Sequence, residues 1–177
     1  MSDDTATVEL LRDVVQINCR GDADASAFKN PLESVLGQSL PIEPNSVSYG
    51  NHRICWLGPD EWLLLGQGDD AAPPLAELEA AISTRSVALN DVSGGQVVLR
   101  VSGAAVIDLF SKGCPLDFLE TQFPPGTCAQ SSLGKAAALF IRAESGSSFD
   151  VVVRRSFLSY LLAWLRTAGA DCDRVPR

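Results

Sequence analysis

The 177-residue sequence has few of the residues that dominate enzyme active sites and few that bind phosphate. It contains one histidine, His52, and three lysines, and its 22 acidic residues outnumber its 14 basic residues to give a net charge of -8. No basic run is longer than Arg154-Arg155, whereas nucleic-acid binding needs clustered Lys and Arg. We therefore expect no nucleic-acid partner, and the single histidine excludes a metal site built from several histidines.

Long apolar runs and targeting signals are also missing. No stretch approaches the ~20 apolar residues of a membrane-spanning helix, and residues 1–5 have neither the basic nor the apolar region of a secretory signal. We expect a cytoplasmic protein with no membrane partner. The five cysteines are odd in number and form no C-x-x-C pair, which favours buried structural thiols over a zinc or redox motif.

The remaining composition is typical of a folded protein with a sizeable core, since 46% of the residues are hydrophobic and 20% are charged. Apolar spacing and turn residues predict two kinds of element. Strands are expected at residues 14–19, 46–49, 53–56, 62–65, 87–89, 96–101, 127–131, 136–141 and 149–153. Helices are expected at residues 24–36, 73–82, 102–113 and 156–168.

Capping residues predict where the helices begin and end. Asp24 is expected to cap the first helix, Pro31 to restart it after a break, and Gly37 to end it. Ser102 and Ser156 are the expected N-caps of the third and fourth helices.

The order of these elements predicts an internal duplication. Strand, helix, strands and helix occur twice, in pseudo-repeat halves of approximately 8–85 and 86–170, although the two halves share negligible sequence identity. We therefore predict an α+β fold in which two strand-helix-strands-helix lobes pack as one unit, a single domain over residues 1–177.

The candidate reactive groups are scattered along the chain. His52 is expected to lie exposed in a turn, with no Ser or Cys nucleophile beside it. Asp60 and Glu61 are adjacent, and neighbouring side chains of an extended chain point to opposite faces, so paired acid/base catalysis is not expected. Ser93-Gly94-Gly95 fits a hairpin-type turn, and no phosphate-binding glycine motif occurs. We predict no catalytic, cofactor-binding or metal-binding residue.

The last predicted helix is apolar over about 200° of its circumference, whereas ~100° suffices to face one core. One stripe consists of Phe157, Leu161, Trp164 and Ala168, and the other of Leu158, Leu162 and Leu165. Such a helix lies either between its own sheet and the sister lobe or partly against another chain. The predicted partner contacts are the turn at Pro59, Asp60, Glu61 and Trp62 together with Leu158, Leu162 and Leu165.

Several motifs occur together in this chain. They are Leu57-Gly58-Pro59-Asp60-Glu61-Trp62-Leu63-Leu64, Asn90-Asp91-Val92-Ser93, Val101-Ser102-Gly103 leading into Gly113-Cys114-Pro115-Leu116-Asp117, and Arg155-Ser156-Phe157 at a strand-to-helix junction. In this combination the sequence resembles the gamma subunits of bacterial heterotetrameric sarcosine oxidases over roughly residues 16–168. The Gly-Pro-Asp-Glu-Trp run is the most specific of the motifs.

The resemblance implies a fold and a function. The fold is that of the aminomethyltransferase folate-binding domain. The function is that of a non-catalytic subunit which packs chiefly on an alpha subunit, with beta and delta subunits completing the complex. Such a complex oxidises sarcosine with oxygen to glycine and hydrogen peroxide, and with tetrahydrofolate yields methylenetetrahydrofolate. FMN, FAD, NAD and folate are implied in the partner subunits and none in this chain.

The resemblance does not carry folate ligands onto this chain. In the aminomethyltransferase pattern a carboxylate is positioned for the folate, but the corresponding region here, residues 143–150, lacks the expected acidic pair. Two alternatives remain open: a free-standing folate-binding protein of the aminomethyltransferase type, and an accessory subunit of another N-methyl amine oxidase or dehydrogenase.

Overall fold

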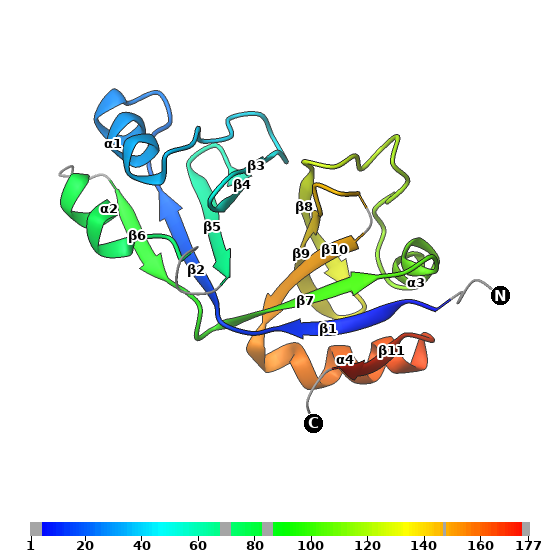
Figure 1. Cartoon of the computed structure of the whole chain (residues 1–177). Helices are drawn as coiled ribbons and strands as arrows, with labels where there is room; N and C mark the ends of the chain where they lie inside the picture. Colours follow the sequence, from blue (N-terminus) through cyan, green and yellow to red (C-terminus); the bar gives the residue numbers. More distant parts are fainter. Residues whose placement is uncertain (1–4, 68–71, 83–86, 147, 175–177) are drawn as a thin grey trace. The chain divides into compact units, whose positions relative to one another are not determined.

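The computed structural model describes residues 5–67, 72–82, 87–146 and 148–174. The chain divides into two compact units. The continuous unit is Asp13–Gly94, and the discontinuous unit combines Met1–Arg12 with Gly95–Arg177. Each unit has its own sheet and its own helices (Figure 1).

The continuous unit has a five-stranded antiparallel sheet in the order β3-β4-β5-β2-β6. Helices α1 and α2 contact each other, as Figure 1 shows. Phe28, Leu32 and Leu36 from α1 pack in one core with Ile17 and Trp62 from the sheet. In chain order the elements are β2 (Val14–Arg20), α1 (Ser26–Leu36), β3 (Val47–Tyr49), β4 (Arg53–Gly58), β5 (Glu61–Gln67), α2 (Leu75–Ala81) and β6 (Ala88–Asp91).

The discontinuous unit has a six-stranded sheet in the order β11-β1-β7-β10-β9-β8. Its strands pair antiparallel except for β1 with β11, which pair parallel. In chain order the elements are β1 (Thr7–Leu11), β7 (Gln96–Ser102), α3 (Val106–Ser111), β8 (Cys128–Leu133), β9 (Ala136–Arg142), β10 (Ser148–Arg154), the 3-10 helix η2 (Arg155–Phe157), α4 (Leu158–Thr167) and β11 (Asp171–Arg174).

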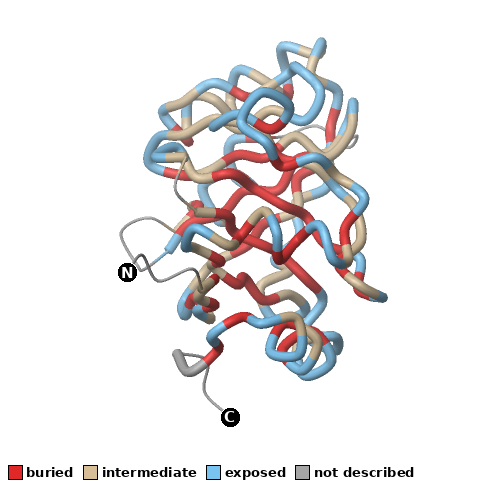
Figure 2. The backbone as a smooth tube through the Cα atoms, turned by 90° about the vertical axis from the view of Figure 1, so that its right-hand side faces the viewer, coloured by how far each residue is buried: buried red, intermediate tan, exposed pale blue. Residues whose placement is uncertain are grey.

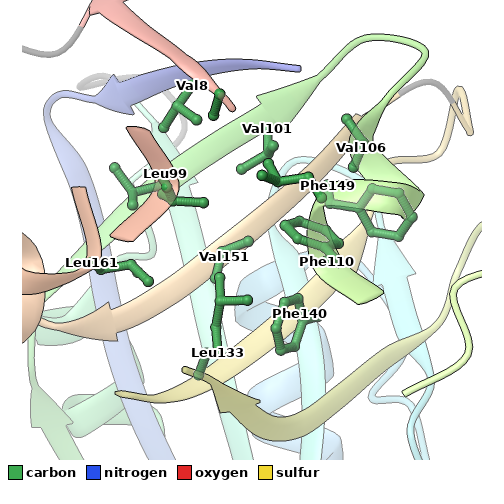
Figure 3. Close-up of a cluster of buried hydrophobic side chains, with 14 of the residues drawn as sticks. Val8, Leu99, Val101, Val106, Phe110, Leu133, Phe140, Phe149, Val151 and Leu161 are labelled. Carbon is green, nitrogen blue, oxygen red and sulfur yellow. The ribbon is translucent and has the colours of Figure 1, made fainter. Parts of the chain in front are cut away.

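Aromatic side chains fill much of the core of the discontinuous unit (Figure 3). Phe110, Phe118, Phe140 and Phe149 contact one another with ring centroids 4.9 to 5.5 Å apart. The rings meet tilted or edge to face, the geometry that aromatic pairs prefer. Figure 2 shows the burial of the backbone along the chain, with buried stretches in red and exposed stretches in pale blue. The core therefore holds α3, through Phe110, against the sheet.

The predicted duplication is confirmed in the topology of the two sheets. The sequence β2-α1-β3-β4-β5-α2 corresponds to β7-α3-β8-β9-β10-α4, and the sheet order β3-β4-β5-β2 corresponds to β8-β9-β10-β7. The α+β fold predicted from the order of elements is therefore correct.

The boundaries of the halves differ from the predicted 8–85 and 86–170. Strand β1 belongs to the discontinuous unit because it pairs with β7, with Thr7 opposite Ser102 and Leu11 opposite Val98. Neither β1 nor β11 is among the predicted strands. Their pairing partners lie far away in the sequence, and local patterns carry no information about such pairing.

Three of the predicted helix caps are wrong, and one is confirmed. Helix α1 runs unbroken through Pro31, and no side chain caps its N-terminus. Phe28, Leu32 and Leu36 lie in the core on both sides of the proline, and their burial offsets the ~3 kcal/mol that an interior proline costs. Gly37 ends the helix as predicted, with φ 65° and its N–H donating to the Glu33 carbonyl.

The predicted serine caps fail because the chain reaches each helix through an extra turn. Ser102 is still part of β7, and Ala105 precedes α3 without a side-chain cap. Ser156 lies inside η2, and Phe157 precedes α4. The Ser93-Gly94-Gly95 segment is not a hairpin, because β6 before it and β7 after it belong to different sheets.

Candidate interaction surface

The turn between β4 and β5 is tied to the end of β2. Glu61 Oε2 lies 3.0 Å from Arg20 Nη2, and Glu61 Oε1 accepts a 2.8 Å hydrogen bond from Asn18 Nδ2. Asp60 Oδ1 lies 3.8 Å from the same arginine nitrogen, and the Gly21 N–H donates to the Asp60 carbonyl. Both carboxylates therefore face one arginine and fix the turn to the end of β2. Residues 58–61 are called the braced turn below.

Trp62 is a core residue. Its side chain is fully buried, and its ring centroid lies 5.8 Å from that of Phe28. The indole Nε1 donates a 2.8 Å hydrogen bond to the Pro41 carbonyl. The partner contact expected of Trp62 stays a prediction, and the structure shows the indole used inside its own unit. In front of it, Pro59 and Asp60 are exposed and Glu61 is half-buried, so this turn is the part that a partner can reach.

The Asn90 to Ser93 motif fastens the end of β6 to β2. Ser93 donates to Asp91 Oδ1 through its hydroxyl at 2.5 Å and its backbone N–H at 2.8 Å. The Gln16 N–H donates to Ser93 Oγ, and the Val92 N–H donates to the Gln16 carbonyl. The hydrogen bonds from the Ser93 hydroxyl and then its N–H lower the pKa of Asp91. These hydrogen bonds hold the loop after β6 against β2, and residues Asp91–Ser93 are called the Asp91–Ser93 clasp below.

Helix α4 buries one side and exposes the other. Leu161, Leu162 and Leu165 are buried in the core of the discontinuous unit, and Leu158 packs against that core half-buried. The partner contact expected of Leu162 and Leu165 stays a prediction, and both side chains are used in the core of their own unit. This core therefore takes leucines from both apolar stripes of the helix.

Two aromatic side chains, and not these leucines, are the large apolar groups exposed at the surface of η2 and α4. Phe157 is 38% exposed and Tyr160 is 36% exposed, with ring centroids 6.3 Å apart in an edge-to-face arrangement. Sequence reasoning assigned Phe157 to a buried stripe and missed Tyr160. The available signal was their i, i+3 spacing, which places two aromatics on one side of the junction.

A buried arginine organises the connection between α3 and β8. Arg142 Nη1 donates to the Phe118 and Phe123 carbonyls at 3.2 and 2.9 Å, and Nη2 donates to the Gly146 carbonyl at 3.2 Å. Nη2 also lies 3.5 Å from the exposed carboxylate of Glu120. The Asp117 carboxylate accepts a hydrogen bond from the Leu119 N–H at 2.9 Å. These polar groups hold an irregular segment in place.

An ion pair with a buried carboxylate crosses the sheet of the discontinuous unit. Asp150 on β10 stands opposite Arg100 on β7 and accepts two hydrogen bonds from it, at 2.9 and 3.0 Å. The hydrogen bond to Asp150 raises the pKa of the Arg100 guanidinium. In this bidentate geometry both oxygens of the Asp150 carboxylate bind the Arg100 guanidinium.

The histidine and the cysteines are buried. His52 is only 7% exposed, so the prediction of an exposed turn histidine is wrong. Its backbone N–H and carbonyl are both bound by the Gln38 side-chain amide, which draws the turn inward. All five cysteines are buried as predicted, and burial raises the pKa of the Cys19 thiol to about 12.

Within the described ranges, no three His, Cys, Asp or Glu side chains come together where they could hold a metal ion. The described helices include none with the length and apolar character needed to span a bilayer. One open depression of about 290 Å³ lies in the continuous unit, and Glu79 is the one charged group in its lining. The lining residues are Glu79, Ile82, Val87, Ala88, Leu89 and Asn90.

Comparison with known proteins identifies relatives along nearly the whole chain. The chain is 29% identical to the sarcosine oxidase subunit gamma of Corynebacterium sp. (strain P-1), covering 97% of this chain and 85% of that protein. It is 29% identical to the sarcosine oxidase subunit gamma of an Arthrobacter species, covering 94% and 83%.

Two solved structures share the fold. One is a heterotetrameric sarcosine oxidase from Corynebacterium sp. U-96 in complex with pyrrole 2-carboxylate, with a TM-score of 0.86 and 24% identity over 95% of this chain and 85% of that chain. The other is the glycine cleavage system aminomethyltransferase T from Bartonella henselae, with a TM-score of 0.65 and 15% identity over 93% of this chain and 46% of that chain. The expected aminomethyltransferase-like fold is therefore confirmed.

The sequence signature extends over the same region as the fold. Residues 20–171 match the family described as "Sarcosine oxidase, gamma subunit family". The matched region contains the braced turn, the Asp91–Ser93 clasp, the Arg142 cluster and helix α4. The chain therefore belongs to the sarcosine oxidase gamma subunit family.

Proposed function

We propose that this chain is the non-catalytic gamma subunit of a heterotetrameric, flavin-dependent sarcosine oxidase in the cytoplasm. It packs chiefly on the alpha subunit and supports assembly, with beta and delta subunits in the same complex. The complex oxidises sarcosine with oxygen to glycine and hydrogen peroxide, and with tetrahydrofolate forms methylenetetrahydrofolate. FMN, FAD, NAD and folate are held by the partner subunits.

The family match over residues 20–171 is the observation that supports this proposal most directly. It covers elements of both units, so the resemblance extends well beyond one shared motif. The named relatives are gamma subunits themselves, and the structural relative with a TM-score of 0.86 is a heterotetrameric sarcosine oxidase.

The use of the acidic side chains supports a non-catalytic role. Glu61 is bound by Asn18 and Arg20, Asp91 by Ser93, and Asp150 by Arg100. A general base must reach a substrate proton at hydrogen-bond distance, whereas these carboxylates already bind groups of their own unit. The motif positions of Glu61 and Asp91 are explained by these contacts within the folded unit.

Co-purification tests the proposal. The tagged chain is co-expressed with the large flavin-bearing subunit and the smaller companion subunits of the same organism, and the purified material is examined for stoichiometry and visible flavin absorption. We expect a yellow complex with sarcosine-dependent peroxide production, and a colourless isolated chain with none. Sarcosine oxidation by the isolated chain, or failure to capture any companion subunit, would contradict the proposal.

The shared aminomethyltransferase fold raises the second candidate, a free-standing folate-binding protein. Calorimetric titration of the isolated chain with tetrahydrofolate separates the two. Our proposal expects no heat of binding at micromolar concentrations, whereas a saturable micromolar isotherm favours the alternative.

A further inference from the structure

Exposed apolar side chains are few, and two of them lie together. Among the described residues, the large hydrophobic side chains that are exposed are Ile42, Leu119, Phe157 and Tyr160. Phe157 and Tyr160 contact each other at the junction of η2 and α4, with ring centroids 6.3 Å apart. Aromatic pairs of this kind are enriched at the anchoring positions of protein interfaces.

The exposed side of α4 is a continuous strip. Ser159, Tyr160, Ala163, Arg166 and Thr167 are the exposed residues of the helix, and at 100° per residue they fall within an arc of about 120°. Tyr160 lies at one edge of this arc and Arg166 at the other. The middle of the strip is formed by small side chains, over which a partner can approach the backbone closely.

The aromatic anchors are held in position before any partner arrives. Tyr160 Oη accepts a 3.0 Å hydrogen bond from the Lys135 N–H in the turn between β8 and β9. That turn contains Gly134, with φ 58°, and a Cβ there would lie 2.6 Å from Tyr160 Oη. The tyrosine is therefore packed against the backbone, and a side chain already ordered loses little entropy on binding.

Positive charge surrounds these aromatics, although the chain as a whole carries a net charge of -8. No acidic residue occurs between positions 151 and 170, and Arg154 and Arg166 are exposed at the two ends of this segment. Exposed Lys135 lies beside Tyr160, and Lys112 Nζ donates to the Ala168 carbonyl at the C-terminus of α4. These four of the 14 basic residues thus lie on this helix or close to it in the chain or in space.

We infer that the α4 surface, defined by Arg154, Phe157, Tyr160, Arg166 and Lys135, docks an acidic protein surface that carries an apolar pocket for the two rings. The inference rests on the proposed function, and the partner is an acidic face of the companion large subunit. Opposite charges favour and orient the encounter, and the rings supply most of the affinity. The net negative charge of the chain repels nucleic acid and anionic lipid.

The test measures binding of the purified full chain to the companion large subunit by biolayer interferometry over a series of salt concentrations. Phe157→Ser should weaken binding by about tenfold or more. Its matched control is Leu119→Ser, which removes a more exposed apolar side chain elsewhere in the same unit. Arg166→Glu should weaken binding by about three- to tenfold at low salt and less at high salt, whereas Arg12→Glu should not. Circular dichroism checks that each variant is folded.

The outcomes separate this inference from the proposed function. If the wild-type chain does not bind the companion subunits, the proposed function fails. If the wild type binds and both α4 variants bind equally well, the docking surface is elsewhere and this inference alone is overturned. It is also overturned if Arg166→Glu abolishes binding to phosphatidylserine vesicles or single-stranded DNA while leaving the subunit complex intact. Hydrogen-exchange protection of residues 154–167 on complex formation would support it.

Discussion

Replacing Trp62 with phenylalanine tests whether this residue of the Gly-Pro-Asp-Glu-Trp motif serves folding or partner binding. The structure buries the indole completely, stacks it near Phe28 and uses its N–H to bind the Pro41 carbonyl. The variant keeps an aromatic ring at the site but loses the hydrogen bond and part of the buried volume. We therefore expect a loss of folding stability with no direct effect on a partner contact.

The size of the loss follows from two contributions. The smaller ring gives up buried apolar contact worth about 2 kcal/mol. The Pro41 carbonyl loses its indole donor, which costs about 1 kcal/mol because the proline is half-buried and water reaches it in part. The sum of about 3 kcal/mol corresponds to a fall in melting temperature of roughly 6–12 °C for a chain of this size.

The assay is urea or thermal unfolding of the isolated chain followed by far-ultraviolet circular dichroism, with Trp56→Phe as the matched control. Trp56 stands opposite Trp62 in the β4–β5 pair but is only half-buried, so its replacement should cost less. Equal unfolding midpoints for wild type and Trp62→Phe would refute the reasoning. So would unchanged stability combined with weakened binding of the companion subunit.

Three further predictions concern the polar clusters and the thiols. Arg142→Met leaves three carbonyl groups without their donor and should destabilise the discontinuous unit by about 3 kcal/mol; faster chymotryptic cleavage after Phe118 and Leu119 checks this. Ser93→Ala should raise the pKa of Asp91, observable by NMR titration, since Ser93 lowers it. Because the folded pKa of Asp91 lies below the unfolded value, its contribution to stability is present above the unfolded pKa and is lost as pH falls through the folded pKa. In Ser93→Ala this loss should shrink. Finally, the five cysteines should resist a disulfide reagent at mildly alkaline pH until the chain unfolds, because all five are buried from the reagent and burial also raises the pKa of the Cys19 thiol to about 12; rapid labelling of the folded chain would contradict this.

The repeated order of elements was predictable because it depends on local signals. Weak apolar alternation in residues 14–19 and a continuous apolar run in residues 62–65 mark strands, and Gly37 marks a helix end because glycine readily adopts the positive φ found there. The pairing of β1 with β7 and β11 was not predictable, since it joins segments more than 80 residues apart and depends on which sheet edge is available. The same limitation made residues 8–12 look like part of the first half.

The candidate surface was predicted only in outline. The unusually apolar sequence of the last helix pointed to α4 as a contact surface. Its helical periodicity does not show how much of the apolar arc is buried by the chain's own core. Leu162 and Leu165 are buried by that core, whereas Phe157 and Tyr160 remain outside it. The hydrogen bond from the Lys135 N–H to Tyr160 joins residues 25 positions apart, and no local sequence pattern predicts it.

The amino-acid sequence alone determined the α+β class, the duplicated order of elements and the membership of a gamma subunit family, because periodicity, turn residues and motif spacing are local properties of the chain. Only the tertiary structure decided that Trp62 faces inward and that β1 joins the six-stranded sheet of the discontinuous unit. It also decided that an aromatic and basic strip is exposed on the last helix. Burial is a property of the whole packed core, and the core forms from residues that are distant in sequence.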